Sequence, residues 1–288
     1  MAYLSNPTET KAVLDMFGFS FAKKYGQNFL IDGNIVSNIV KNAGITKEDT
    51  VLEIGPGIGT MTQVLCEQAK NVIAVEIDKR LIDVLTFTLR DYDNVTVINS
   101  DILKCNIEEL CRQYSSNGRL KVVANLPYYI TTPIIMELLE KNNNSVIESI
   151  TVMIQKEVAE RLGAEAGNKD YGAITLSINY YSDANIVMTV PASCFMPRPN
   201  VDSAVIRMDI YDKPPVATKD EVKMFKVIKA AFSQRRKTLV NSVSSSTDIA
   251  KETILKSLNE MGLSESVRGE TLSLEQFAEL SDRIIENS

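Results

Sequence analysis

Short apolar runs recur along the first half of the chain, and the stretches between them place their apolar residues at helical spacing. Four such runs are Val51–Ile54, Val72–Val75, Val95–Ile98 and Lys121–Ala124. After the second run, the apolar positions on one side of a helix are Leu81, Val84, Leu85 and Leu89. Strands that alternate with helices predict an α/β fold, in which a parallel sheet is covered by helices on both faces.

The second half of the chain predicts the rest of this sheet and a separate helical part. The expected elements are a fifth strand (147–155), a helix through Leu162, a helix (171–181) and an antiparallel pair of strands (186–190 and 203–210). A proline-stiffened loop, 191–199, joins the last two strands. Residues 211–215 have the composition of a linker, and the residues after them have helical patterning. The sequence therefore predicts two domains, 1–211 and 212–288.

A polar residue closes each of the first four strands. These residues are Glu53, Glu76, Asp101 and Asn125, and their spacings of 23, 25 and 24 residues each correspond to one strand–helix unit. The carboxyl ends of parallel strands meet at one edge of a sheet, where such sheets bind ligands. We therefore expect the four side chains to face one crevice.

A glycine-rich loop, Glu53–Thr60, follows the first strand and opens a helix. Glycines allow a ligand to approach the backbone closely, and a helix start offers free N–H groups. A dinucleotide fingerprint needs glycine where this chain has Thr60, so the loop favours a nucleoside cofactor without a pyrophosphate. Glu76 is placed to accept hydrogen bonds from both ribose hydroxyls. Asp101 is placed to accept from an adenine amino group, and it can also serve as a helix N-cap.

The fourth strand ends in Asn125-Leu126-Pro127-Tyr128. The carboxamide oxygen of Asn125 and the carbonyl of Leu126 can each accept one N–H from an amino group on a flat ring. Pro127 has a fixed φ and holds the carbonyl in place, while Tyr128 offers a face for stacking a flipped-out base. The motif therefore indicates chemistry on N6 of adenine. A strand end followed by a proline turn is the simpler alternative.

Composition excludes several classes of chemistry. The chain of 288 residues has no histidine, which rules out Ser-His-Asp and Cys-His nucleophiles and His-ligated metals. Its four cysteines form no C-x-x-C pair, so we expect reduced thiols and no metal site. No stretch approaches the length of a membrane helix and the N-terminus has no apolar signal core, so we expect a cytoplasmic protein.

The net charge of −6 by itself argues against a nucleic-acid partner. However, residues 212–288 carry 12 basic and 12 acidic residues, so the whole excess of acidic residues lies in residues 1–211. Within 222–242 there is no acidic residue, and the basic ones are Lys223, Lys226, Lys229, Arg235, Arg236 and Lys237. A local basic face can bind phosphate because screening limits distant charges to a reach of about 10 Å. An ordinary solvated helix face is the alternative.

These motifs together resemble those of the rRNA adenine N6-dimethyltransferases, which are class I S-adenosylmethionine-dependent enzymes. The resemblance covers nearly the whole chain, and within the family it is strongest to members that act on bacterial small-subunit (16S) rRNA. Besides the motifs above, it rests on Tyr25–Leu30, Phe195–Ser203 and Phe232–Leu239. It implies a Rossmann-like seven-stranded class I methyltransferase sheet over 1–211 that binds S-adenosylmethionine. It further implies a small all-α rRNA-binding domain over 212–288.

The resemblance also implies roles for individual residues. The cofactor-binding set is Gln27, Asn28, Leu30, Gly55, Gly57, Glu76, Ile77, Asp101, Ile102 and Asn125. The catalytic set is Asn125, Leu126, Pro127 and Tyr128. The set that touches the base or the RNA is Tyr128, Phe195, Lys223, Arg235, Arg236 and Lys237, and Phe195 can equally be a plain core residue. The implied partner is small-subunit rRNA within an immature ribosomal subunit, bound by a monomeric enzyme without metal.

Three other functions share parts of this pattern. The large-subunit rRNA dimethyltransferases that confer macrolide-type resistance share every cofactor motif, although Leu126, Tyr128 and the segment 234–237 favour the small-subunit enzymes. A non-catalytic RNA-binding assembly or transcription factor could use the same fold, but an intact Asn125–Tyr128 motif and Glu76 argue for catalysis. An NAD dehydrogenase is disfavoured by Thr60.

Overall fold

The computed structural model describes residues 4–19, 26–140, 145–234 and 236–288. The chain divides into two compact units, Met1–Ala159 with Ala184–Ile210, and Glu160–Asp183 with Tyr211–Ser288. The division after residue 210 lies next to the boundary expected from the sequence. Residues 160–183, which the sequence analysis assigned to the first domain, belong to the second unit.

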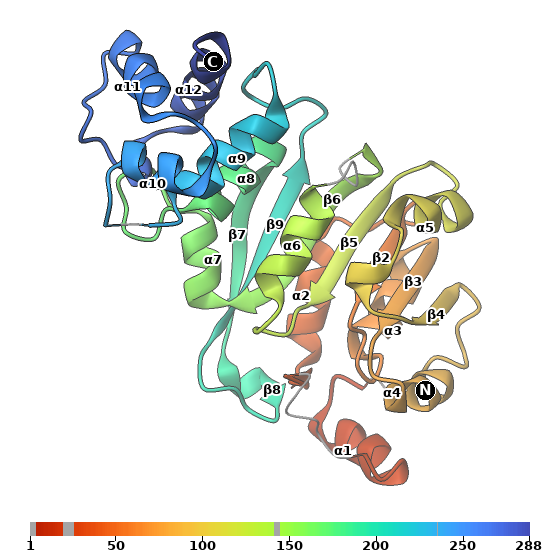
Figure 1. The fold of residues 1–288 in the computed structure, drawn as a ribbon. Coiled ribbons are helices and arrows are strands. Elements are labelled where there is room, and N and C mark those ends of the chain that lie inside the picture. The colour runs from red at the N-terminus through yellow and green to blue at the C-terminus, as the bar shows by residue number, and fades with distance from the viewer. Residues whose placement is uncertain (1–3, 20–25, 141–144, 235) are drawn as a thin grey trace. The chain divides into compact units, whose positions relative to one another are not determined.

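The first unit contains a seven-stranded sheet with strand order β4-β3-β2-β5-β6-β9-β7 (Figure 1). The strands are β2 (Thr50–Ile54), β3 (Asn71–Glu76), β4 (Val95–Asn99), β5 (Leu120–Asn125), β6 (Ile147–Gln155), β7 (Ser182–Val190) and β9 (Ser203–Ile210). The five strands from β4 to β6 are parallel, and β9 runs antiparallel to β6. All seven predicted strands are confirmed, and β7 begins four residues earlier than its pattern indicated.

Helices precede and connect these strands. They are α1 (Pro7–Met16), α2 (Gly33–Asn42), α3 (Thr60–Gln68), α4 (Arg80–Thr88), α5 (Ile107–Tyr114), α6 (Thr131–Leu139) and α7 (Lys156–Leu162), with short 3₁₀ turns at Ile102–Lys104 and Ala192–Cys194. Val51 and Val123 of the sheet share one core cluster with Val36 of α2 and Leu65 of α3. The apolar side of α4 is buried, as its spacing predicts. The sheet is thus held by the apolar faces that the sequence pattern marked.

One pairing in the first unit has no counterpart in the sequence pattern. The two-residue strands β1 (Phe29–Leu30) and β8 (Phe195–Met196) pair antiparallel, with Leu30 opposite Phe195. The backbone N–H of Ile31 also donates to the carbonyl of Cys194 at 2.9 Å. Phe195 is buried in the core cluster that includes Leu30. The structure therefore agrees with the plain core alternative for Phe195.

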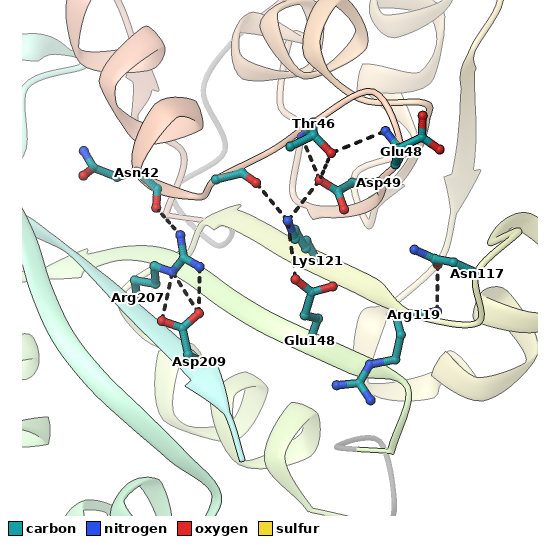
Figure 2. A network of polar contacts seen from close by, with 11 residues as sticks. Asn42, Thr46, Glu48, Asp49, Asn117, Arg119, Lys121, Glu148, Arg207 and Asp209 are labelled. Carbon is teal, nitrogen blue, oxygen red and sulfur yellow. Dashed lines mark hydrogen bonds and ion pairs between the residues drawn. The ribbon is translucent and has the colours of Figure 1, made fainter. Parts of the chain in front are cut away.

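A buried cation lies at the amino edge of the sheet (Figure 2). Lys121, near the start of β5, donates from Nζ to the carbonyl of Gly44 at 2.8 Å and to Asp49 Oδ2 at 3.0 Å, and it pairs with Glu148 at 3.5 Å. Burial raises the pKa of Asp49, but hydrogen bonds from Lys121 and Thr46 outweigh it and lower that pKa below its usual value. Buried charges are tolerated when they are paired in this way. This network anchors the start of β5, whereas Asn125 lies at the other end of the strand.

The second unit is built from helices. They are α8 (Ala173–Tyr181), α9 (Glu221–Ala231), α10 (Leu239–Ser246), α11 (Lys251–Glu260) and α12 (Leu274–Glu286), with a 3₁₀ turn at Gly269–Thr271. The ring of Tyr181 stacks on Phe225 with centroids 5.6 Å apart, and Tyr180 meets the same ring edge-on at 5.2 Å. Both tyrosine hydroxyls donate to Glu221. These aromatic contacts explain why α8 belongs to this unit. Among the described residues, no helix combines the length and the apolar character needed to span a bilayer.

Candidate active site

A pocket that is open to solvent lies at the carboxyl edge of the parallel strands. The lining residues come from the start of β1 and the segment before it, the glycine loop, the ends of β3 and β5 with the residues that follow them, and α4: Gly26, Gln27, Asn28, Phe29, Gly55, Gly57, Glu76, Ile77, Leu81, Asn125, Leu126, Pro127, Tyr128 and Tyr129. The structure therefore brings together all four residues of the expected catalytic set and seven of the ten residues of the expected cofactor-binding set.

The glycine loop contributes two positions where only glycine fits, for different reasons. Gly55 has a φ of 69°, and a Cβ there would meet no atom within 4 Å, so its backbone is open to a ligand. Gly57 has a φ of 62°, and a Cβ there would lie 2.9 Å from Cε1 of Phe29. Both conformations are left-handed and disfavour other residues. Gly55 thus leaves room for a cofactor, while Gly57 leaves room for the pocket wall.

Glu76 ends β3 and is almost fully buried beside this loop. Its Oε1 accepts from the N–H of Asp78 at 2.8 Å, and its Oε2 accepts from the N–H of Gly57 at 3.2 Å. Burial raises the pKa of Glu76 to about 7, although these backbone hydrogen bonds oppose the rise. Each oxygen keeps a second lone pair, so the ionised group can still accept from a pair of hydroxyls.

Ile77, directly after Glu76, offers an apolar face to the pocket. It is 47% exposed, which is high for a large aliphatic residue at the end of a buried strand. An adenine ring is flat and apolar on its faces, so this exposed side chain suits it. Open backbone at Gly55, paired acceptors on Glu76 and the apolar Ile77 together fit a nucleoside cofactor.

Three residues of the expected cofactor set do not line the pocket. Leu30 is buried in the core cluster of α2 and α3. Ile102 is buried as well. Asp101 is the N-cap of the 3₁₀ turn that begins at Ile102, where its Oδ1 accepts from the N–H of Leu103 at 3.1 Å. The capping role considered for Asp101 is thus present, and the cofactor contacts of these residues stay predictions.

The carboxamide of Asn125 has a defined orientation. Its Nδ2 donates to the backbone carbonyl of Asn28 at 3.0 Å. A carbonyl can only accept, so the amide must turn its nitrogen to Asn28 and its Oδ1 away from it. Within the described part of the chain, neither Oδ1 of Asn125 nor the carbonyl oxygen of Leu126 accepts a hydrogen bond. Two acceptors therefore remain at the tip of β5.

The tip itself is rigid. The N–H of Leu126 donates to the carbonyl of Met153 on β6 at 3.1 Å, and the Leu126 side chain is buried. The carbonyl of Pro127 accepts from the hydroxyl of Thr131 at 3.1 Å. Asn28 is held too, because its own Nδ2 donates to the carbonyl of Gly26 at 3.1 Å.

Tyr128 and Tyr129 form the aromatic wall of the pocket. The hydroxyl of Tyr128 lies 2.8 Å from Oγ of Ser203, and burial raises the pKa of Tyr128, so the phenol stays protonated near neutral pH. Tyr129 is exposed, and a Cβ on Gly26 would lie 3.5 Å from its ring. Sequence reasoning missed Tyr129, although a second aromatic residue directly after the Asn125–Tyr128 motif was an available signal.

A second residue that sequence reasoning missed is Asp78. Its Oδ2 accepts from Nε2 of Gln27 at 2.9 Å and pairs with Arg80 at 2.6 Å. The hydrogen bonds from Arg80 lower the pKa of Asp78. Asp78 therefore ties the Gln27-Asn28 segment to the end of β3. An acidic residue two positions after Glu76 was the only hint in the sequence.

Glu53 differs from the expectation that all four strand-end side chains face the crevice. It is 1% exposed and does not line the pocket. Burial raises the pKa of Glu53 to about 8, with the Thr62 hydroxyl opposing the rise and the Glu76 carboxylate adding to it. Glu53 precedes the last residue of β2, and its carboxyl lies close to the hydroxyl of Thr62 on α3. It is a core carboxyl rather than a ligand-facing one.

The basic residues expected to contact RNA lie in the second unit. Lys223 is half-buried on α9, and Arg236 and Lys237 are exposed ahead of α10. Lys226 is 3.7 Å from Asp248. Arg235 lies outside the described residues. RNA contact by this segment stays a prediction.

The chain is similar to known proteins over nearly its whole length. The model of the family described as ribosomal RNA adenine dimethylase matches residues 18–286. A protein from Lachnoclostridium phytofermentans named ribosomal RNA small subunit methyltransferase A is 55% identical, over 99% of each chain. A protein of the same name from Bacillus licheniformis is 48% identical, over 98% of each chain.

Solved structures have the same fold. A dimethyladenosine transferase from Plasmodium falciparum has a TM-score of 0.72 at 25% identity, covering 88% of this chain and 95% of its own. The 23S rRNA methyltransferase ErmE has a TM-score of 0.65 at 25% identity, covering 90% of this chain and 100% of its own. These likenesses confirm the predicted fold class.

Proposed function

Because this chain belongs to the ribosomal RNA adenine dimethylase family, we propose that it methylates N6 of two adjacent adenosines in small-subunit (16S) rRNA. The product is N6,N6-dimethyladenosine, made during maturation of the small ribosomal subunit. The family uses S-adenosylmethionine as its methyl donor. The observation that carries the proposal is the pair of unused acceptors, Oδ1 of Asn125 and the carbonyl of Leu126, at the rigid tip of β5.

The two acceptors match the two N–H groups of the adenine amino group. In free adenine the N6 lone pair is delocalised into the ring and is a poor nucleophile. Accepting both N6 hydrogens favours a pyramidal nitrogen whose lone pair is directed out of the ring plane. Tyr128 supports this geometry by stacking on the base. Catalysis then rests on orientation and on carbonyl dipoles that face the positive charge developing on N6.

The cofactor supplies a methyl group that is already activated on a sulfonium sulfur. The residues proposed to hold it are Gly55, Glu76 and Ile77, with Asn28 near its methionine end. After transfer, N6 is an ammonium group and is acidic enough to lose its proton to water. No protein base is needed, which is consistent with a chain that contains no histidine.

The second unit is proposed to bind rRNA, with 212–288 as the RNA-binding domain and Lys223, Arg235, Arg236 and Lys237 contacting phosphates. Lysine and arginine clusters supply most of the sequence-independent affinity for RNA. We further infer a monomeric, cytoplasmic enzyme whose substrate is the rRNA of an immature small subunit.

The test is transfer of labelled methyl from S-adenosylmethionine to under-methylated small ribosomal subunits, with large subunits in parallel and nucleoside mass analysis of the RNA. Dimethyladenosine in small-subunit RNA alone is the expected result. The second candidate is a 23S rRNA methyltransferase, because the structure is also similar to that of ErmE. Dimethyladenosine in large-subunit RNA would support this candidate. Whole-chain identities of 48–55% to small-subunit enzymes favour the first. If neither subunit is methylated, the remaining candidate function is that of a non-catalytic RNA-binding factor.

A further inference from the structure

The hydroxyl of Tyr128 is tied to one buried side chain. Oγ of Ser203 lies 2.8 Å from it, and Ser203 is fully buried as the first residue of β9. Both residues belong to the first unit. A tyrosine ring has only two side-chain torsions, so anchoring its hydroxyl sets the tilt of the ring. The Tyr128 ring that lines the pocket is therefore held in place through its hydroxyl group.

Ser203 has little freedom to move. Ser203 on β9 pairs with Gln155 on β6. The backbone carbonyl of the adjacent Asp202 accepts a hydrogen bond from the N–H of Lys156 at 3.0 Å. The carboxylate of Asp202 also accepts the N–H of Ala192 at 2.9 Å. The serine hydroxyl is thus presented by a strand whose backbone is bonded on both sides of it.

The two methyl transfers place different demands on this ring. Adenine offers two N–H groups, one for Oδ1 of Asn125 and one for the carbonyl of Leu126. N6-methyladenine has only one N–H, so one of the two hydrogen bonds is lost in the second transfer. The orientation of N6-methyladenine in the pocket must therefore depend more on the stacking surface that Tyr128 provides.

We propose that Ser203 is a positioning residue that fixes the Tyr128 ring and thereby determines whether the second methyl transfer is completed. The inference rests on the proposed function. In each transfer the N6 lone pair forms the new carbon–nitrogen bond, the electrons of the broken carbon–sulfur bond stay on sulfur, and N6 releases a proton to water. The second transfer consumes a second molecule of S-adenosylmethionine.

The experiment compares Ser203→Ala, Tyr128→Phe and the double variant with the wild-type protein on under-methylated small subunits. The readout is the ratio of dimethyladenosine to monomethyladenosine at matched early times. Loss of one such hydrogen bond corresponds to about a 2- to 10-fold fall in this ratio. Both single variants should show it, and the double variant should show no more than either one, because they break the same bond. The affinity for S-adenosylmethionine should not change.

Ser149→Ala is the matched control. Ser149 is a buried serine on β6, at the end of the β6–β9 pair remote from Ser203, and within the described residues its hydroxyl has no hydrogen-bond partner. Its substitution should leave the product ratio unchanged. Should Ser203→Ala fail to fold, Tyr128→Phe removes the same bond without touching β9 and decides the matter alone.

An unchanged product ratio with proportionally reduced total transfer would overturn the proposal, since a merely structural serine lowers both transfers together. Additive effects of the two substitutions would overturn it as well. Failure of the proposed function looks different, because the wild-type protein would then make neither product in small-subunit RNA.

Discussion

Replacing Glu53 with glutamine should stabilise this protein, and by an amount that increases with pH. Glu53 is 1% exposed, and burial raises the pKa of its carboxyl from 4.5 to about 8. Between these two values the folded chain keeps a proton that the unfolded chain has released. The group therefore destabilises the fold progressively as pH rises through this window. Glutamine has the shape of the protonated acid and does not titrate.

The magnitude follows from the width of the window. Each pKa unit of difference between the folded and unfolded states corresponds to about 1.4 kcal/mol. From pH 5 to pH 8, Glu53 should cost the wild-type protein about 3 to 4 kcal/mol of unfolding free energy relative to the variant. Glu76, whose pKa burial raises to about 7, acts in the same direction, but it is present in both proteins and largely cancels.

Urea unfolding at pH 5, 6, 7 and 8, followed by circular dichroism, measures this difference. The gap between Glu53→Gln and wild type should widen by roughly 1 kcal/mol per pH unit and level off above pH 8. Glu48→Gln, the same substitution at an exposed position, is the control and should show no widening. A gap that does not depend on pH would refute the reasoning, because Glu53 would then be ionised in the folded protein.

Three further outcomes are expected. Asn125→Ala should reduce methyl transfer below about a tenth of wild type with cofactor affinity by calorimetry nearly intact, and greater residual activity would contradict its role. Glu76→Ala, in contrast to Asn125→Ala, should act mainly by weakening the binding of the cofactor. In the wild-type protein, affinity should rise between pH 6 and pH 8 as Glu76, with its pKa of about 7, ionises, and a flat profile would count against the ribose contact. The pair Arg236→Ala and Lys237→Ala should weaken rRNA binding and flatten its salt dependence without altering cofactor affinity, whereas an unchanged salt slope would remove them from the interface.

Features that depend on neighbouring residues could be predicted from the sequence. The alternation of apolar runs and helical stretches determines the strands of the sheet, because each element marks its own buried face. The Asn125–Tyr128 motif and Glu76 were located correctly at strand ends, and the sheet topology brings both to one edge. The family resemblance was sound because its motifs are spread over nearly the whole chain.

Features that depend on distant residues were decided only by the tertiary structure. The pairing of Leu30 with Phe195, the carbonyl of Asn28 on Asn125, and the hydroxyl of Ser203 on Tyr128 each join segments separated by 75 or more residues. No local pattern specifies such partners, because a hydrogen bond at that separation depends on how whole elements pack.

The same reason explains two of the places where local reasoning and the structure differ. Glu53 is one of four polar residues at strand ends, but it is buried in the core beside Thr62 of α3. The helix α8 lies between β6 and β7 in the sequence, yet Tyr180 and Tyr181 pack their rings against Phe225, which places α8 in the second unit. Sequence periodicity determined which face of each element is apolar, and only the folded chain decided which partner covers it.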